Sequence, residues 1–146
     1  MNDNDTLQLR AMLADPAMCG VYAVPGDAGI DYLEVARSLD FSGVAIDFRG
    51  CTGKDEALAR LATALRFPDW FGGNWDALAD SLADLSWLPA RGYVLLLERI
   101  DAWRESDPVA FETLSVILED ASARWAGDRI PFWALLPTPG APPAGT

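Results

Sequence analysis

Four carboxylates occupy one short stretch of the chain, residues 67–87, which has the sequence FPDWFGGNWDALADSLADLSW. They are Asp69, Asp76, Asp80 and Asp84, and the stretch contains neither lysine nor arginine. Asp76 and Asp80 are four residues apart, which is one helical turn, and like charges at this spacing destabilise a helix by roughly 0.2–0.5 kcal/mol. A helix face with uncompensated carboxylates is therefore the first candidate for a functional site.

Paired carboxylates can perform acid–base catalysis or bind a metal, but the sequence gives little support for either. Acid–base catalysis requires surroundings that separate the two pKa values, and exposed aspartates without a histidine or a third ligand lack such surroundings. Mg²⁺ would bind only weakly through one or two carboxylates. Histidine is absent from the chain, which removes the commonest general base and metal ligand. We expect no enzymatic activity, no metal and no cofactor, and a weak metal-dependent enzyme is the least favoured alternative.

An ordinary amphipathic helix with a solvated face would also explain the aspartates. At 100° per residue, the apolar side chains of this helix share one face: Trp75, Leu78, Ala79, Leu82 and Leu85. Asp76, Asp80 and Asp84 lie on the opposite face. Solvated faces normally mix positive and negative charges, whereas this one has no cation one turn away. Asp76 gains from the helix dipole at the N-terminus, but Asp80 in mid-helix does not. The pattern favours a binding surface.

The rest of the chain is expected to place this helix on a sheet. Apolar, β-type runs predict strands at residues 20–24, 43–49, 93–98 and 130–136. Helical periodicity predicts helices at residues 7–13, 31–39, 52–65, 75–84 and 107–126. Their expected caps are Thr6, Thr52 paired with Asp55, Asn74, and Asp107 followed by Pro108. Residues 1–5 are expected to be frayed, and consecutive helices are expected only around residues 67–74. Strands that alternate with helices indicate an α/β fold, a parallel β-sheet covered by helices.

Length and composition limit the class of protein. A chain of 146 residues, 51% of them hydrophobic, fits one domain with a real core. Its net charge of −11 repels nucleic acid and anionic membranes and attracts basic proteins. The N-terminus does not resemble a signal peptide, and no apolar run is long enough to span a membrane. Cys19 and Cys51 fit free thiols in a reducing compartment. These features predict a cytoplasmic protein that binds neither nucleic acid nor membranes.

The motif FPDWFGGNWDALADSL closely resembles the core motif of the barstar family, small inhibitors of barnase-type ribonucleases. The resemblance is long and specific: an aromatic-rich loop after proline, then Gly, Asn, Asp-Ala-Leu and a second Asp four residues on. It covers about residues 43–136 and implies a compact α/β fold for them. Residues 1–42 are then an N-terminal extension that packs on the sheet as an extra β-α segment and adds an edge strand, and residues 137–146 a disordered Pro/Gly tail.

The resemblance also implies a function and a set of contact residues. The protein would bind a basic ribonuclease in a 1:1 complex and occlude its active site, in an immunity or antitoxin role. The residues that match the family's contact positions are Trp70, Gly72, Asn74, Asp76, Ala79, Asp80 and Asp120. Asp80 matches the aspartate that enters the phosphate site, and Asp120 is one methylene shorter than the family's glutamate. Ala79 replaces a tryptophan of the best-known member, which leaves the preferred partner open. The alternative is an acidic interaction module for a different basic protein or regulator.

Overall fold

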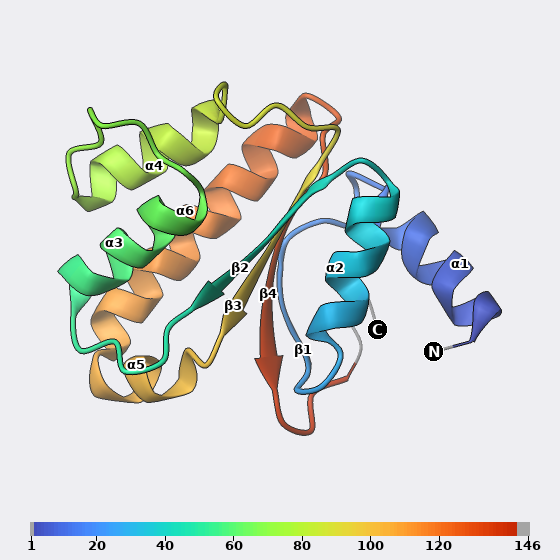
Figure 1. Cartoon of the computed structure of the whole chain (residues 1–146), viewed down its shortest axis with the longest axis horizontal. Helices are drawn as coiled ribbons and strands as arrows, with labels where there is room; N and C mark the ends of the chain where they lie inside the picture. The colour runs from blue at the N-terminus through green and yellow to red at the C-terminus, as the bar shows by residue number, and fades with distance from the viewer. Residues whose placement is uncertain (1, 143–146) are drawn as a thin grey trace.

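The computed structural model describes residues 2–142 as one parallel sheet between two layers of helices (Figure 1). The strand order is β1-β4-β3-β2, with all neighbours parallel. The strands are β1 (Val21–Pro25), β2 (Ser42–Asp47), β3 (Tyr93–Glu98) and β4 (Phe132–Thr138). The helices are α1 (Asp3–Leu13), α2 (Gly29–Ser38), α3 (Lys54–Ala64), α4 (Trp75–Asp84), α5 (Asp101–Ser106) and α6 (Pro108–Gly127). The predicted α/β fold with a helix-covered parallel sheet is confirmed.

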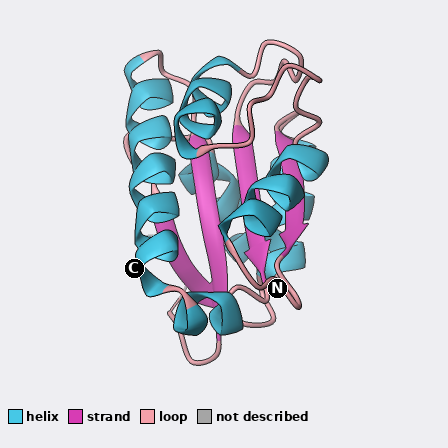
Figure 2. Ribbon diagram, turned by 90° about the vertical axis from the view of Figure 1, so that its left-hand side faces the viewer, coloured by secondary structure: helices cyan, strands magenta, loops and turns pink. Residues whose placement is uncertain are grey.

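The central strand β3 separates two hydrophobic cores. Its Leu95 and Leu97 side chains pack into the core that α3, α4, α5 and α6 cover. Its Val94 and Leu96 side chains point the other way, into a smaller core under α1 and α2. Figure 2 shows the strands enclosed between helices on both sides. A strand buried on both faces explains why this run is almost continuously apolar, and its predicted range of residues 93–98 is confirmed.

The segment before β2 completes the smaller core. β1 is an edge strand that pairs with β4, with Val21 opposite Ala134 and Val24 opposite Pro137. The Trp133 side chain of β4 is fully buried there, among residues of α1, α2 and β1. Residues 2–42 and residues 43–142 therefore share one sheet and one buried layer.

Three tryptophans hold the C-terminal ends of helices, where backbone carbonyls lack partners within the helix. The indole N–H of Trp133 donates to the carbonyl of Leu13 at the end of α1, with an N–O distance of 3.0 Å. Trp87 donates to Leu65 O after α3 at 3.0 Å, and Trp125 donates to Leu82 O in the last turn of α4 at 2.7 Å. Such bonds contribute about 0.5–1.5 kcal/mol each to stability, and they attach the end of each helix to a distant part of the chain.

Two predicted N-caps, Thr6 and Thr52, were wrong. α1 begins at Asp3 and not at Leu7, because Asn2 accepts a hydrogen bond from the Asp5 N–H at 2.8 Å and replaces Thr6 as the cap. Residues 3–5 are therefore helical and not frayed. At α3, the N-cap is Gly53 and not Thr52. The capping hydrogen bond to Thr52 is therefore made by Glu56 and not by Asp55. The Glu56 carboxylate accepts a hydrogen bond from the backbone N–H of Thr52 at 3.2 Å. This bond, and after it the hydrogen bond from Arg60, lowers the pKa of Glu56.

Two predictions for the C-terminal half of the chain were wrong. Helix α5 was missed, so consecutive helices, α5 and α6, also occur between β3 and β4. It has only six residues, and the fully buried Trp103 attaches it to the core. β4 continues to Thr138, so Pro137 and Thr138 belong to a strand and not to a disordered tail, because β1 extends far enough to pair with them. Residues 143–146 of that predicted tail lie outside the described residues.

Candidate functional site

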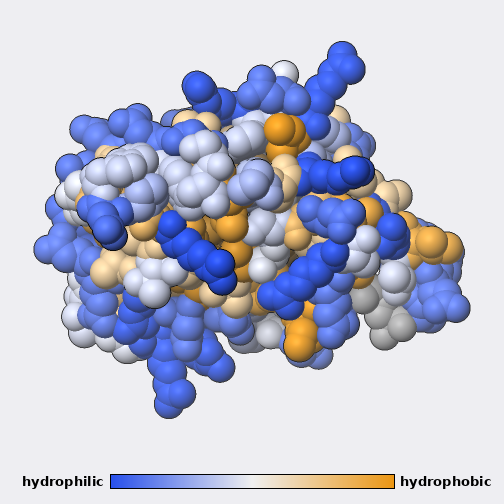
Figure 3. Space-filling model, turned by 45° about the horizontal axis from the view of Figure 1, so that its top comes forward, coloured by the Kyte–Doolittle hydropathy of each residue, from blue (hydrophilic) through white to orange (hydrophobic). Residues whose placement is uncertain are grey.

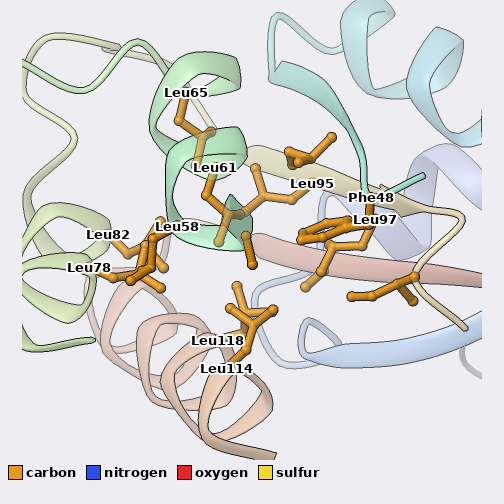
Figure 4. Close-up of a cluster of buried hydrophobic side chains, with 14 of the residues drawn as sticks. Phe48, Leu58, Leu61, Leu65, Leu78, Leu82, Leu95, Leu97, Leu114 and Leu118 are labelled. Atoms are coloured by element: carbon orange, nitrogen blue, oxygen red, sulfur yellow. The ribbon is translucent and has the colours of Figure 1, made fainter. Parts of the chain in front are cut away.

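The acidic helix α4 occupies the predicted range of residues 75–84, which is confirmed. Its Leu78 and Leu82 side chains are fully buried and point towards the leucines of α3 and α6 in the larger core (Figure 4). Ser81 is buried beside them, whereas Ala79 is exposed. The prediction that Ala79 lies on the buried face was wrong, because that face is centred between Leu78, Leu82 and Ser81 and not on Trp75.

The opposite face of α4 carries its three aspartates. Asp76, Asp80 and Asp84 are all exposed. The ion pairs within residues 2–142 are Arg60–Glu56 and Arg99–Asp47, so no aspartate of α4 is paired. The structure thus retains the like-charge repulsion along the helix, and these carboxylates are fully available to a cationic partner.

The N-terminus of α4 is fixed by a tight turn and a cap. Asn74 has extended backbone angles, and its Oδ1 accepts a hydrogen bond from the Ala77 N–H at 2.7 Å. Gly73 before it has φ +69°, a left-handed conformation that favours glycine. Gly72 is exposed, and an added Cβ would lie 3.5 Å from Asn74 Nδ2, which is an ordinary contact. The predicted Asn74 cap is confirmed. Asp76, in the first turn, benefits from the helix dipole.

The far end of α4 is fixed by α6. Leu85 adopts a left-handed conformation and ends the helix, and its N–H donates to Ser81 O. The Trp125 indole of α6 donates to Leu82 O and packs against Tyr93, with ring centroids 5.2 Å apart. The acidic face is therefore mounted on a helix that is held at both ends and along its buried side.

The remaining predicted site residues lie on neighbouring elements. Trp70 is in the loop between α3 and α4 and is 66% exposed, with its ring edge-to-face against Trp87 at 6.0 Å. Asp120 is exposed on α6, which packs directly against α4. The structure thus places all seven predicted residues in exposed positions on α4, the loop before it or the helix beside it.

Sequence reasoning missed the indole hydrogen bonds by which Trp87 and Trp125 hold this region. Both follow the acidic row in the chain, but indole hydrogen bonds to distant helix carbonyls leave no periodic signal. The only available clue was the number of tryptophans, six in 146 residues.

Away from α4, the described residues form a groove but no cluster of metal ligands. Within residues 2–142, no group of three or more acidic or cysteine side chains is arranged to hold a metal ion. A groove of about 320 Å³ lies between β2 and α3, away from α4. Arg60 lines it, but its guanidinium is already bonded to Glu56 and to the carbonyl of Asp47. In the described part of the chain, no helix has the length and apolar character needed to cross a bilayer. Hydrophilic side chains dominate the face shown in Figure 3.

Comparison with known proteins agrees with the motif in the sequence. The family model described as Barstar (barnase inhibitor) matches residues 41–137, about two thirds of the chain. No curated protein matches the chain significantly. Among solved structures, the ORC2 protein of Aeropyrum pernix in its ADPNP–ADP complexes has a similar fold, with a TM-score of 0.59 and 14% identity. That likeness covers 93% of this chain but 41% of the other, and it shows a similarity of fold alone. From the family match, the chain belongs to the barstar family of barnase inhibitors.

Proposed function

We propose that this protein inhibits a basic ribonuclease by inserting the acidic face of α4 into the active site of the enzyme. The observation that carries this proposal is the exposed, unpaired row of Asp76, Asp80 and Asp84 on a helix fixed at both ends. A ribonuclease active site is a basic cleft shaped for phosphate. A rigid row of carboxylates matches its charge but contains no bond that the enzyme can cleave.

The fixed position of α4 supports tight binding. A helix already held in its bound conformation loses little conformational freedom when the complex forms. The Asn74 cap, the buried leucines and the Trp125 hydrogen bond all act before the partner arrives. The repulsion between Asp76 and Asp80 is then relieved by the cations of the partner.

The proposed contact surface extends beyond the carboxylates. Its members are Trp70, Gly72, Asn74, Asp76, Ala79, Asp80 and Asp120. Trp70 would supply an exposed aromatic anchor, the kind of residue that dominates many interfaces. Gly72 and Ala79 have little side chain, so the partner backbone can approach there. Asp120 adds a carboxylate from α6. The protein itself would perform no chemistry and need no cofactor.

Barnase is the first ribonuclease to test, because the family description names it. Increasing amounts of the chain are added to a fixed amount of barnase, and RNA hydrolysis is followed. We expect activity to fall linearly and to vanish at an equimolar ratio, which indicates a 1:1 complex. Unchanged hydrolysis at a tenfold excess of the chain would contradict a barnase-type partner. The immunity role and the cytoplasmic location remain predictions.

The exposed Ala79 keeps a second candidate open, an acidic module for another basic protein. Without a large side chain at this position, the middle of the α4 surface is comparatively flat. A basic non-nuclease partner that binds the same aspartates, with barnase left uninhibited, would favour this alternative.

A further inference from the structure

The exposed ring of Trp70 has a single aromatic neighbour. Trp70 is 66% exposed, and its only ring contact within residues 2–142 is the edge-to-face contact with Trp87. The two ring centroids are 6.0 Å apart, and the ring planes meet at 87°. Its indole N–H has no hydrogen-bond partner in the described part of the chain, and the ring contact with Trp87 can limit its rotation.

Trp87, in contrast, is held from two other sides. Its indole N–H donates to Leu65 O at 3.0 Å, and its ring meets Phe67 edge-to-face at 5.7 Å and 84°. Phe67 in turn packs against Phe71 at 4.8 Å. The rings of Phe71, Phe67, Trp87 and Trp70 therefore form a continuous series, which we call the aromatic ladder. The ladder has a fixed inner part and one exposed end.

The ladder joins chain segments on both sides of the acidic helix. Phe67, Trp70 and Phe71 precede α4, whereas Trp87 follows it. The two exposed glycines, Gly72 and Gly73, would otherwise give the loop before α4 considerable conformational freedom. Contact across the ladder restricts this loop without using any residue of the α4 polar face.

We infer that Trp87 is a positioning residue for the proposed partner site: it holds the exposed indole of Trp70 in its binding orientation before a partner arrives. The inference rests on the proposed function in taking Trp70 as a contact. A tryptophan that is already oriented loses less side-chain freedom on binding than a freely rotating one. Trp87 therefore increases affinity although its own ring is only partly accessible.

The first test concerns Trp70 orientation and requires no partner. The full chain is labelled with 5-fluorotryptophan, and the ¹⁹F resonance of Trp70 is assigned with Trp70→Phe. In Trp87→Leu we expect this resonance to move towards its position in the unfolded protein and to narrow. Trp87→Phe keeps an aromatic edge and should give a smaller change. Trp125→Phe is the matched control, because it also removes an indole–carbonyl bond, and it should leave the Trp70 resonance in place.

A Trp70 resonance that is unchanged in a folded Trp87→Leu protein would overturn the inference, whatever the chain binds. Retained ¹⁹F dispersion of the other tryptophans shows that the variant is folded. If Trp87→Leu does not fold, Trp87→Phe decides: an unchanged Trp70 resonance there overturns the inference, and an intermediate shift supports it.

The second test measures affinity for barnase. Edge-to-face pairs of this type are worth about a 2- to 10-fold change in an equilibrium constant. We expect Trp87→Leu to weaken barnase binding by about that factor in the wild-type background and to have no effect in a Trp70→Ala background. Equal losses in both backgrounds would show that Trp87 does not act through Trp70. Absence of wild-type binding would refute the barnase proposal alone, because the ¹⁹F result stands independently.

Discussion

Replacing Asn74 with alanine removes the side chain that begins α4. Its Oδ1 lies 2.7 Å from the Ala77 N–H, a donor that has no partner within the helix. Loss of such a cap costs about 0.5–2 kcal/mol. For a chain of this size, each kcal/mol lowers Tm by about 2–4 °C. We therefore expect Asn74→Ala to unfold at a lower urea midpoint, with an unchanged dependence of the unfolding free energy on urea concentration.

Two further replacements of Asn74 separate the cap from other effects. Glycine tolerates the N-cap conformation and should cost only about a few tenths of a kcal/mol. Aspartate retains an acceptor oxygen and adds negative charge at the helix N-terminus, so Asn74→Asp should be about as stable as the wild type. If the alanine variant has the same urea midpoint as the wild type, the Asn74–Ala77 bond does not stabilise α4, and the proposed preorganisation of its first turn is wrong.

Three other predictions concern the charge, the extension and the cysteines. If the carboxylates of α4 steer a basic ribonuclease, its association rate should fall about tenfold or more between low and physiological salt, with a smaller change in dissociation; stopped-flow rates independent of salt would contradict steering. Leu13→Ala, at the fully buried end of α1, should lower the free energy of unfolding by about 2–5 kcal/mol in a urea melt. Inhibition should remain intact. Loss of inhibition in the folded variant would show that the N-terminal extension, residues 1–42, is part of the interface. Cys19 and Cys51 are free in the structure, and burial raises the pKa of the Cys51 thiol. Thiol titration without reductant should therefore find two thiols in the unfolded protein, and Cys51 should react slowly in the folded protein. Finding no thiol after unfolding would indicate a disulfide.

The elements that the sequence predicted best are those with a strong local signal. α4 has an asparagine cap and a clear apolar stripe, and β3 is continuously apolar, so both ranges were correct. α5 failed because six residues give too short a period to recognise, and it is held in place by Trp103, which is buried in the larger core against Phe48 and Phe111. The start of α1 failed because Thr6 and Asn2 are both good caps, and only the structure shows which one accepts the bond.

In the candidate site, too, the features with a local signal were predicted and the long-range contacts were not. The exposed row of Asp76, Asp80 and Asp84 follows from helical spacing within one segment. The contacts that fix this row are long-range: Trp125 bonds to Leu82 of α4, 43 residues earlier in the chain, and Trp87 bonds to the end of α3. Ala79 was misplaced because the orientation of an isolated helix can be judged only from its own sequence, whereas α3 and α6 determine which side is covered.

The most direct test of the central claim is the dissociation constant of Asp80→Ala with barnase, measured beside its urea melt. The change removes repulsion from Asp76 and Asp84, each roughly 0.2–0.5 kcal/mol, and introduces a stronger helix former, so the fold should be as stable as before or slightly more. If the Asp80 carboxylate fills the phosphate site, binding should weaken by about 2–5 kcal/mol, or roughly 30- to 4000-fold. This is the general range for removing one partner of a buried charge pair, and barnase–barstar complexes are among the cases from which the range is known. Asp84→Ala should weaken binding much less. Unchanged affinity of a folded Asp80→Ala would contradict the claim that this row occupies a ribonuclease active site.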